Sequence, residues 1–249
     1  MLFSGNRKHY YFYDLHAQKV QKMGGLGGSA QSEKTLQNLA VGSRKFYSFG
    51  AKDGTVLVYG QDSKKSLFDL KMNGSCAAMA FSKDEKQMFT VGDQTEIYQW
   101  DLSMRKCIGR VSDTGSFSST ALAVSPTGNL LATGSKMGSV NLFAVDGGAG
   151  IEATPLKSID NLTTAITDLQ FNHTGELLAF SSKWKKNSIK MAHIPSYTVY
   201  QNFPGVAPGV LKYPFCGGFS HRSQYYALGN DEGKCHLFEL DHFTKSHGQ

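Results

Sequence analysis

Residues 79–102 read MAFSKDEKQMFTVGDQTEIYQWDL, and this stretch decides the fold. Apolar residues lead into a polar turn at residues 82–86, a second short apolar run covers residues 88–91, and a tight turn at residues 92–95 precedes a third run ending at Trp100. Short runs rich in β-branched and aromatic residues, separated by polar turns, are typical of consecutive β-strands. The stretch therefore predicts three antiparallel strands joined by tight turns.

The same order of strand, turn, strand, turn and strand recurs along the chain. Residues 122–143, 169–194 and 217–240 repeat it, and residues 39–59 repeat it more loosely. The third strands end at Tyr59, Trp100, Phe143, Ala192 and Phe238, which lie 41, 43, 49 and 46 residues apart. A period of roughly 40–45 residues is the signature of a four-stranded propeller blade. We therefore predict an all-β fold, a β-propeller of four-stranded blades.

We divide the chain as one propeller domain, residues 1–249. Residues 1–15 are expected to form a partial blade and residues 16–38 a connection that contains the Gly-rich stretch MGGLGGS. The repeats are then residues 39–75, 76–115, 116–162, 163–210 and 211–243, with a tail at 244–249. Outer, fourth strands are expected at residues 65–70, 106–111, 156–159 and 198–203. The Gly-rich stretch lacks the GK[ST] ending of a phosphate-binding loop, so we interpret it as a link between blades.

Composition excludes several classes of protein. The 249 residues, 40% of them hydrophobic, suit a globular body, and no run of about 18 apolar residues could cross a membrane. The N-terminal residues MLFSGNRKHYY lack the apolar stretch of a signal peptide, so we expect a reducing compartment. Cys76, Cys107, Cys216 and Cys235 lie far apart without a CxxC pair, and we expect buried free thiols rather than a zinc site or disulfides.

Charge is distributed unevenly along the chain. Between residues 177 and 230 there are six basic residues and no carboxylate, although the whole chain carries a net charge of only +6. A basic surface that faces a polyanion is one interpretation. The alternative is that scattered lysines on strand edges only deter edge-to-edge pairing.

The repeats resemble WD40 repeats, in which Trp100-Asp101 is the literal WD dipeptide and Asp53 matches the Asp of the second turn. No repeat has the Gly-His that opens a WD40 repeat, so the buried hydrogen-bond network of that family is expected to be absent or rebuilt. The structural repeat positions are Asp53, Gly54, Tyr59, Trp100, Asp101, Phe143 and Phe238.

Several longer stretches are more specific than a generic repeat. RKHYYFYDL, YQWDL followed by RKCI, FNHTGELLA, KKNSIKMAHIPSYTVYQNFP and YALGNDEGKCHLFELDHF resemble the WD40 domain of the U3 small nucleolar RNA-associated protein eighteen family, from residue 7 to residue 243. The resemblance implies a nucleolar, non-catalytic scaffold of the small-subunit processome, in its UTP-B subcomplex. Its implied partners are other UTP-B WD40 proteins, processome subunits, U3 small nucleolar RNA and precursor rRNA.

The resemblance also sets an expectation about length. Members of that family have a long N-terminal region and about seven blades, against about five to six recognised here, so an N-terminally truncated or reduced propeller is expected.

Enzymatic motifs are missing from the sequence. It contains no GxSxG elbow, HExxH helix, P-loop or EF-hand loop, and we expect no cofactor and no catalysis. A propeller hydrolase with a metal in the central channel is one alternative. A generic WD40 adaptor, such as a substrate receptor of a ubiquitin ligase, is another.

The expected contact residues lie in one loop. Lys183, Trp184, Lys185 and Lys186 join the second and third strands of the repeat at residues 163–210, and an aromatic ring among cations suits phosphate attraction with base stacking. The alternatives are that Trp184 packs on the blade with the lysines solvated, or that the loop binds protein. Weaker candidates are Lys190, Arg7 and Lys8.

Overall fold

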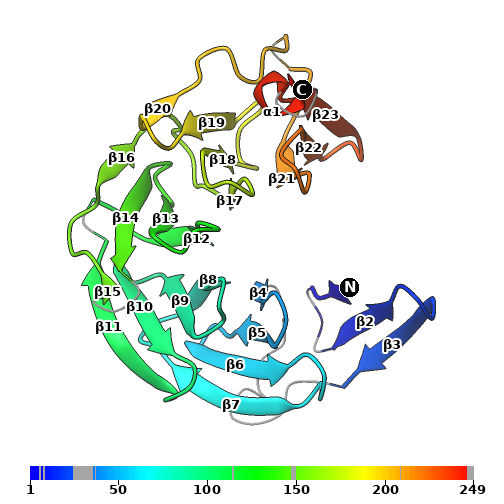
Figure 1. Ribbon diagram of the computed structural model, residues 1–249, viewed down its shortest axis with the longest axis vertical. Helices are drawn as coiled ribbons and strands as arrows, with labels where there is room; N and C mark the ends of the chain where they lie inside the picture. Colours follow the sequence, from blue (N-terminus) through cyan, green and yellow to red (C-terminus); the bar gives the residue numbers. More distant parts are fainter. Residues whose placement is uncertain are drawn as a thin grey trace. The chain divides into compact units, whose positions relative to one another are not determined.

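The structure is a computed structural model that describes residues 1–5, 7, 9–24, 36, 38–113, 115–146, 150–207 and 209–245 (Figure 1). These residues form a series of antiparallel sheets and one short helix, α1 (Asp241–Lys245). They divide into two compact units, Met1–Ser112 and Asp113–Gln249. Within the described ranges, no helix has the length and apolar character needed to cross a membrane.

The first unit contains three sheets. The first pairs β1 (Leu2–Phe3), β2 (Tyr10–Asp14) and β3 (Lys19–Met23). The second contains β4 (Asn38–Val41), β5 (Phe46–Gly50), β6 (Thr55–Gly60) and β7 (Ser66–Lys71). The third contains β8 (Cys76–Phe81), β9 (Gln87–Gly92), β10 (Glu96–Asp101) and β11 (Lys106–Ser112). In each sheet, sequential strands are hydrogen-bonded neighbours, as in a propeller blade.

The second unit repeats this plan. One sheet contains β12 (Ser119–Val124), β13 (Leu130–Ser135) and β14 (Val140–Asp146), whose outer edge pairs with both β15 (Gly150–Ile151) and β16 (Lys157–Ile159). The next contains β17 (Asp168–Phe171), β18 (Leu177–Ser181), β19 (Ile189–His193) and β20 (Thr198–Val199). The last contains β21 (Pro214–Phe219), β22 (Tyr225–Asn230) and β23 (Cys235–Glu239), after which α1 follows.

Burial explains why the middle strands are apolar on both faces. All six residues of β6 are buried, as are five of six in β9, whereas β11 has only exposed and half-buried positions. A strand between two packed layers has no solvent face, so its sequence becomes a near-continuous apolar run. The predicted fold class, an all-β fold of WD40-like propeller blades, is confirmed.

Two predicted boundaries are wrong. Lys19–Met23, which the sequence interpretation places in a connection, is the strand β3 paired with β2. Four of its five residues are exposed, so its polar sequence KVQKM carries no apolar alternation to reveal a strand. The outer strand expected at residues 198–203 spans only Thr198–Val199. Most of the Gly-rich stretch, residues 25–29, lies outside the described residues.

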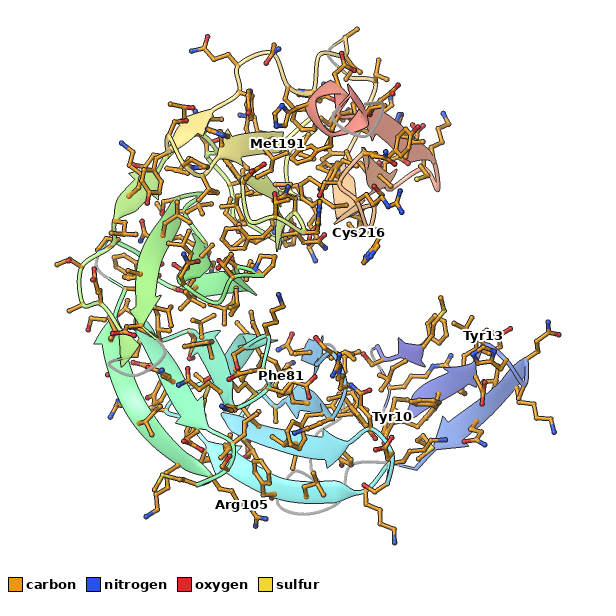
Figure 2. All side chains as sticks on the ribbon, in the orientation of Figure 1. Tyr10, Tyr13, Phe81, Arg105, Met191 and Cys216 are labelled. Atoms are coloured by element: carbon orange, nitrogen blue, oxygen red, sulfur yellow. The ribbon has the colours of Figure 1, made fainter. Side chains whose placement is uncertain are left out.

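The expectation of buried thiols is correct only for Cys76. All four cysteines are free, but Cys107, Cys216 and Cys235 are exposed. Cys107 lies on the outer strand β11, and Cys216 and Cys235 lie on β21 and β23 of the last sheet (Figure 2 labels Cys216). The sequence pattern does not show which face of a strand each of these three cysteines occupies, and that position decides whether the thiol is buried. For Cys76, burial raises the pKa of the thiol to about 12.

The hydrogen-bond network expected to be absent or rebuilt is rebuilt in the sheet that begins with β12. Asp113 is 1% exposed and accepts hydrogen bonds from Ser119 Oγ at 3.0 Å, Thr133 Oγ1 at 2.8 Å and Asn141 Nδ2 at 2.6 Å. One carboxylate therefore joins the segment before β12 to β12, β13 and β14. In the sheet of β8–β11, Trp100 Nε1 donates to Thr90 Oγ1 at 2.9 Å, which links β10 to β9.

Neighbouring sheets within a unit are also fastened through their first turns. In the first unit, the buried Glu85 carboxylate accepts hydrogen bonds from the backbone N–H groups of Arg44 and Lys45 in the β4–β5 turn. In the second unit, the buried Ser223 hydroxyl shares a hydrogen bond of 2.6 Å with His173 Nδ1. His173 is thus a structural partner between sheets.

Candidate functional site

The lysine–tryptophan loop, residues 183–186, connects β18 to β19 in the second unit, as the sequence predicts. All four of its side chains are exposed, and 64% of Trp184 is accessible to solvent. Tryptophan is usually largely buried in folded proteins, so an indole open to solvent is informative. Trp184 is therefore available to a partner instead of filling the blade core.

The base of the loop is fixed by hydrogen bonds on the side of residues 163–167. Ser182 is fully buried, its N–H donates to Ser188 O at 2.9 Å, and its hydroxyl accepts from Thr164 Oγ1 at 2.7 Å. The N–H of Lys183 donates to Thr167 Oγ1 at 3.1 Å. These bonds hold the two ends of the loop together while its tip projects into solvent.

A second anchor lies on the side of residues 211–213. Asn187 has a φ of 55°, a left-handed conformation that asparagine tolerates better than most residues. Its N–H donates to Lys212 O at 2.8 Å, and its side-chain oxygen accepts from the N–H of Leu211 at 3.1 Å. The loop backbone is thereby held on both flanks, which lowers the entropic cost of ordering it around a ligand.

Cations lie over aromatic rings in and beside the loop. Lys183 Nζ is 5.3 Å from the centroid of the Trp184 ring, and Lys186 Nζ is 5.6 Å from the centroid of Tyr213. Lys185 Nζ donates to Thr163 Oγ1 at 3.3 Å. Cation–π contacts of this kind leave the positive charge unneutralised.

The three lysines of the loop differ from their neighbour Lys212 in ion pairing. Across the described part of the chain, Lys183, Lys185 and Lys186 form no ion pair, whereas Lys212 Nζ lies 3.6 Å from Glu232 Oε1. Three uncompensated positive charges beside an exposed indole are suited chemically to a polyanion with planar bases.

The remaining predicted contact residues are not brought into the loop. Lys190 lies on β19 opposite Phe180 and is half-buried. Arg7 is exposed in the connection between β1 and β2, in the other compact unit. Lys8 lies outside the described residues. The sequence interpretation missed Tyr213, whose position directly after Lys212 in the basic segment was the available signal.

The structural repeat positions shape turns and core. Asp53 accepts hydrogen bonds from the N–H of Thr55 at 2.9 Å and its hydroxyl at 3.0 Å, and Lys71 Nζ lies 3.2 Å away. Desolvation alone would raise the pKa of Asp53, but these hydrogen bonds and the Lys71 charge outweigh it and lower that pKa. Gly54 has a φ of 82°, and a Cβ there would lie 2.2 Å from Gly74 O, so this turn requires glycine.

The other repeat positions lie on third strands, near the strand end at Tyr59, Trp100, Asp101 and Phe238 and in the middle of β14 at Phe143. Tyr59, Trp100 and Phe143 are buried, and Phe238 packs against the core of the last two sheets. Asp101 accepts a hydrogen bond of 2.8 Å from the N–H of Met104 and so closes the β10–β11 turn. At that turn, Arg105, labelled in Figure 2, lies over the ring of Phe68. These residues therefore build the core and the turns of the blades.

A metal site is not formed by the described residues, among which no group of three or more His, Cys, Asp or Glu side chains is placed to hold an ion. The lysine–tryptophan loop, exposed to solvent and held at its base by hydrogen bonds, is the candidate site that the sequence predicts.

Comparison with known proteins identifies homologues of this chain. A search of protein-family models found no match. The chain is 37% identical over 247 residues to the U3 small nucleolar RNA-associated protein 18 homolog of Arabidopsis thaliana, which covers 99% of this chain and 45% of that protein. It is also 34% identical over 245 residues to the mouse homolog and to the human homolog. Each of these alignments covers 97% of this chain, together with 44% of the mouse protein and 43% of the human protein. Over nearly its whole length, the chain is homologous to U3 small nucleolar RNA-associated protein 18.

The homology extends across nearly the whole chain but not across the whole of its relatives. The chain spans about half the length of the relatives it matches. The alignments to the Arabidopsis and human proteins include both compact units of this chain. The lysine–tryptophan loop is therefore part of the aligned region.

Proposed function

We propose that this chain is a non-catalytic scaffold in ribosome biogenesis, which acts within the small-subunit processome as a component of the UTP-B subcomplex in the nucleolus. Its partners are other UTP-B WD40 proteins, processome subunits, U3 small nucleolar RNA and precursor rRNA. The observation that carries the proposal is the match, over 99% of this chain, to a protein named for its association with U3 small nucleolar RNA. Propeller blades without a catalytic motif are consistent with a scaffold.

The same proposal assigns RNA contact to the lysine–tryptophan loop. Lys183, Lys185 and Lys186 supply positive charge that no described carboxylate pairs with, and Trp184 supplies an exposed ring for stacking. Phosphate contacts give affinity without sequence preference, and stacking selects unpaired bases. The loop therefore suits a single-stranded segment.

The loop proposal is tested by RNA affinity across a series of salt concentrations. Each phosphate neutralised on a single strand contributes about 0.7 to the slope of log affinity against log salt. Changing Lys183, Lys185 and Lys186 to alanine is expected to lower the affinity for a short fluorescein-labelled oligouridine and to reduce that slope by about 2. Trp184→Ala is expected to cost about 1–3 kcal/mol of binding free energy with the slope unchanged.

The matched control changes Lys83, Lys136 and Lys157 to alanine. These lysines are also exposed, and their removal changes the net charge equally. If the control variant lowers the RNA affinity and the salt slope as much as the loop variant does, binding depends on the net charge of the chain and the loop has no special role. Unchanged affinity and slope in the loop variant would also overturn the assignment.

A further inference from the structure

A groove in the second unit lies apart from the lysine–tryptophan loop and has the opposite character. Its volume is about 600 Å³, and its walls come from the end of β19, the segment after β20, the end of β23 and α1. Pockets that bind ligands commonly measure about 300–1,000 Å³. The groove is thus large enough to hold several side chains of a peptide.

The floor of the groove is apolar and continuous with the core. Leu177, Met191 and Phe243 are 6%, 2% and 7% exposed and belong to one packed cluster with Leu211, Tyr226 and Leu228. Figure 2 labels Met191 on β19. A floor made from core residues is rigid, so it is formed before any ligand arrives.

An aromatic wall stands above this floor. Tyr200 is 40% exposed, and its ring centroid lies 6.4 Å from that of His193. The His193 ring is held by a hydrogen bond of 2.7 Å between Nδ1 and Ser196 Oγ. Tyrosine at the mouth of an apolar groove offers contact area at low entropic cost.

The rim is acidic. Among the residues whose side chains the structure describes, the lining includes Glu176, Glu239 and Asp241 but neither lysine nor arginine. Throughout the described ranges, Glu176 and Glu239 make no ion pair. This acidity is unusual on a chain whose net charge is +6. Carboxylates around the groove repel phosphate, so RNA is disfavoured here and a basic segment is favoured.

We infer that this groove docks an extended segment of a protein partner that carries a large apolar or aromatic side chain flanked by lysine or arginine. The apolar side chain enters the floor at Leu177, Met191 and Phe243. The flanking cations pair with Glu176 and Glu239 on the rim. This surface adds a protein-binding site of defined chemistry to the proposed scaffold, and it does not depend on RNA binding by the lysine–tryptophan loop.

The test selects peptides from a phage-displayed random library against the full chain. The enriched peptides are expected to combine an aromatic or aliphatic residue with neighbouring lysine or arginine. One enriched peptide, made synthetically with a fluorescent label, is then titrated against variants. Changing Glu176 and Glu239 together to lysine is expected to weaken its binding about tenfold or more, and Tyr200→Ala is expected to weaken it as well.

The matched control changes Glu152 and Asp160 together to lysine, since both are exposed in the same unit, neither lines the groove, and the net charge rises as much as in the double groove variant. Each variant is compared with wild type by its urea midpoint to verify folding. Failure to enrich basic apolar peptides, or enriched peptides that bind the groove variants as tightly as wild type, would overturn the inference. Oligouridine binding measured on the same variants is expected to be undiminished, which separates this result from any failure of the RNA proposal.

Discussion

Removal of the Asp113 carboxylate should severely destabilise the second unit. Asp113→Ala leaves three donors, on Ser119, Thr133 and Asn141, without their acceptor in a site where each of these residues is no more than 3% exposed. An unsatisfied buried polar group costs about 1–3 kcal/mol. Because the two hydroxyls can rotate toward other acceptors, we expect a total loss of about 3–5 kcal/mol in the free energy of unfolding.

The loss is large beside the stability of an ordinary domain, which is about 5–15 kcal/mol. Urea unfolding of the full chain, followed by circular dichroism, measures it. Asp113→Asn is the matched variant: it keeps one oxygen to accept from Asn141, and its amide can donate to a hydroxyl, so we expect a loss of only about 1–2 kcal/mol. A loss below about 1 kcal/mol for Asp113→Ala would refute the reasoning that this carboxylate replaces the missing WD40 network.

Two further predictions concern backbone strain and pH. Gly54→Ala should lower the free energy of unfolding by about 2 kcal/mol or more, because the new Cβ meets Gly74 O and Met72 O in a turn with φ of 82°; an unchanged urea midpoint would contradict this. Burial raises the pKa of Asp168 above its ordinary 3.8, with a hydrogen bond from the N–H of Gly217 opposing the rise. The folded chain therefore holds this proton more tightly than the unfolded chain, so stability relative to Asp168→Asn should decline as pH rises from 3.8 toward the folded pKa. Urea midpoints of both proteins over that pH interval test the sign, and a constant difference would contradict it.

The sequence predicts strands well where burial dictates composition. The stretch at residues 79–102 contains β9 and β10 entirely and half of β8, since their apolar runs follow from packing on both faces. Prediction from sequence fails at β3, because the residues KVQKM are mostly exposed and burial does not constrain their composition. The repeat pattern thus identifies buried strands but does not identify strands at a solvent-exposed edge.

The sites also differ in how far they can be predicted from the sequence. The lysine–tryptophan loop can be located from sequence because its residues are consecutive and lie between two recognisable strands. The Asp113 network joins residues up to 28 positions apart, and the acidic groove combines residues from 176 to 243. Such sites depend on which segments the fold brings together, and no local pattern encodes that information.

The most direct measurement is affinity purification of the tagged chain from its own cells, with identification of the proteins and RNAs that accompany it. The proposed function predicts recovery of processome subunits, U3 small nucleolar RNA and precursor rRNA. Recovery of partners unrelated to ribosome assembly, without these RNAs, would contradict the claim that this chain is a processome scaffold.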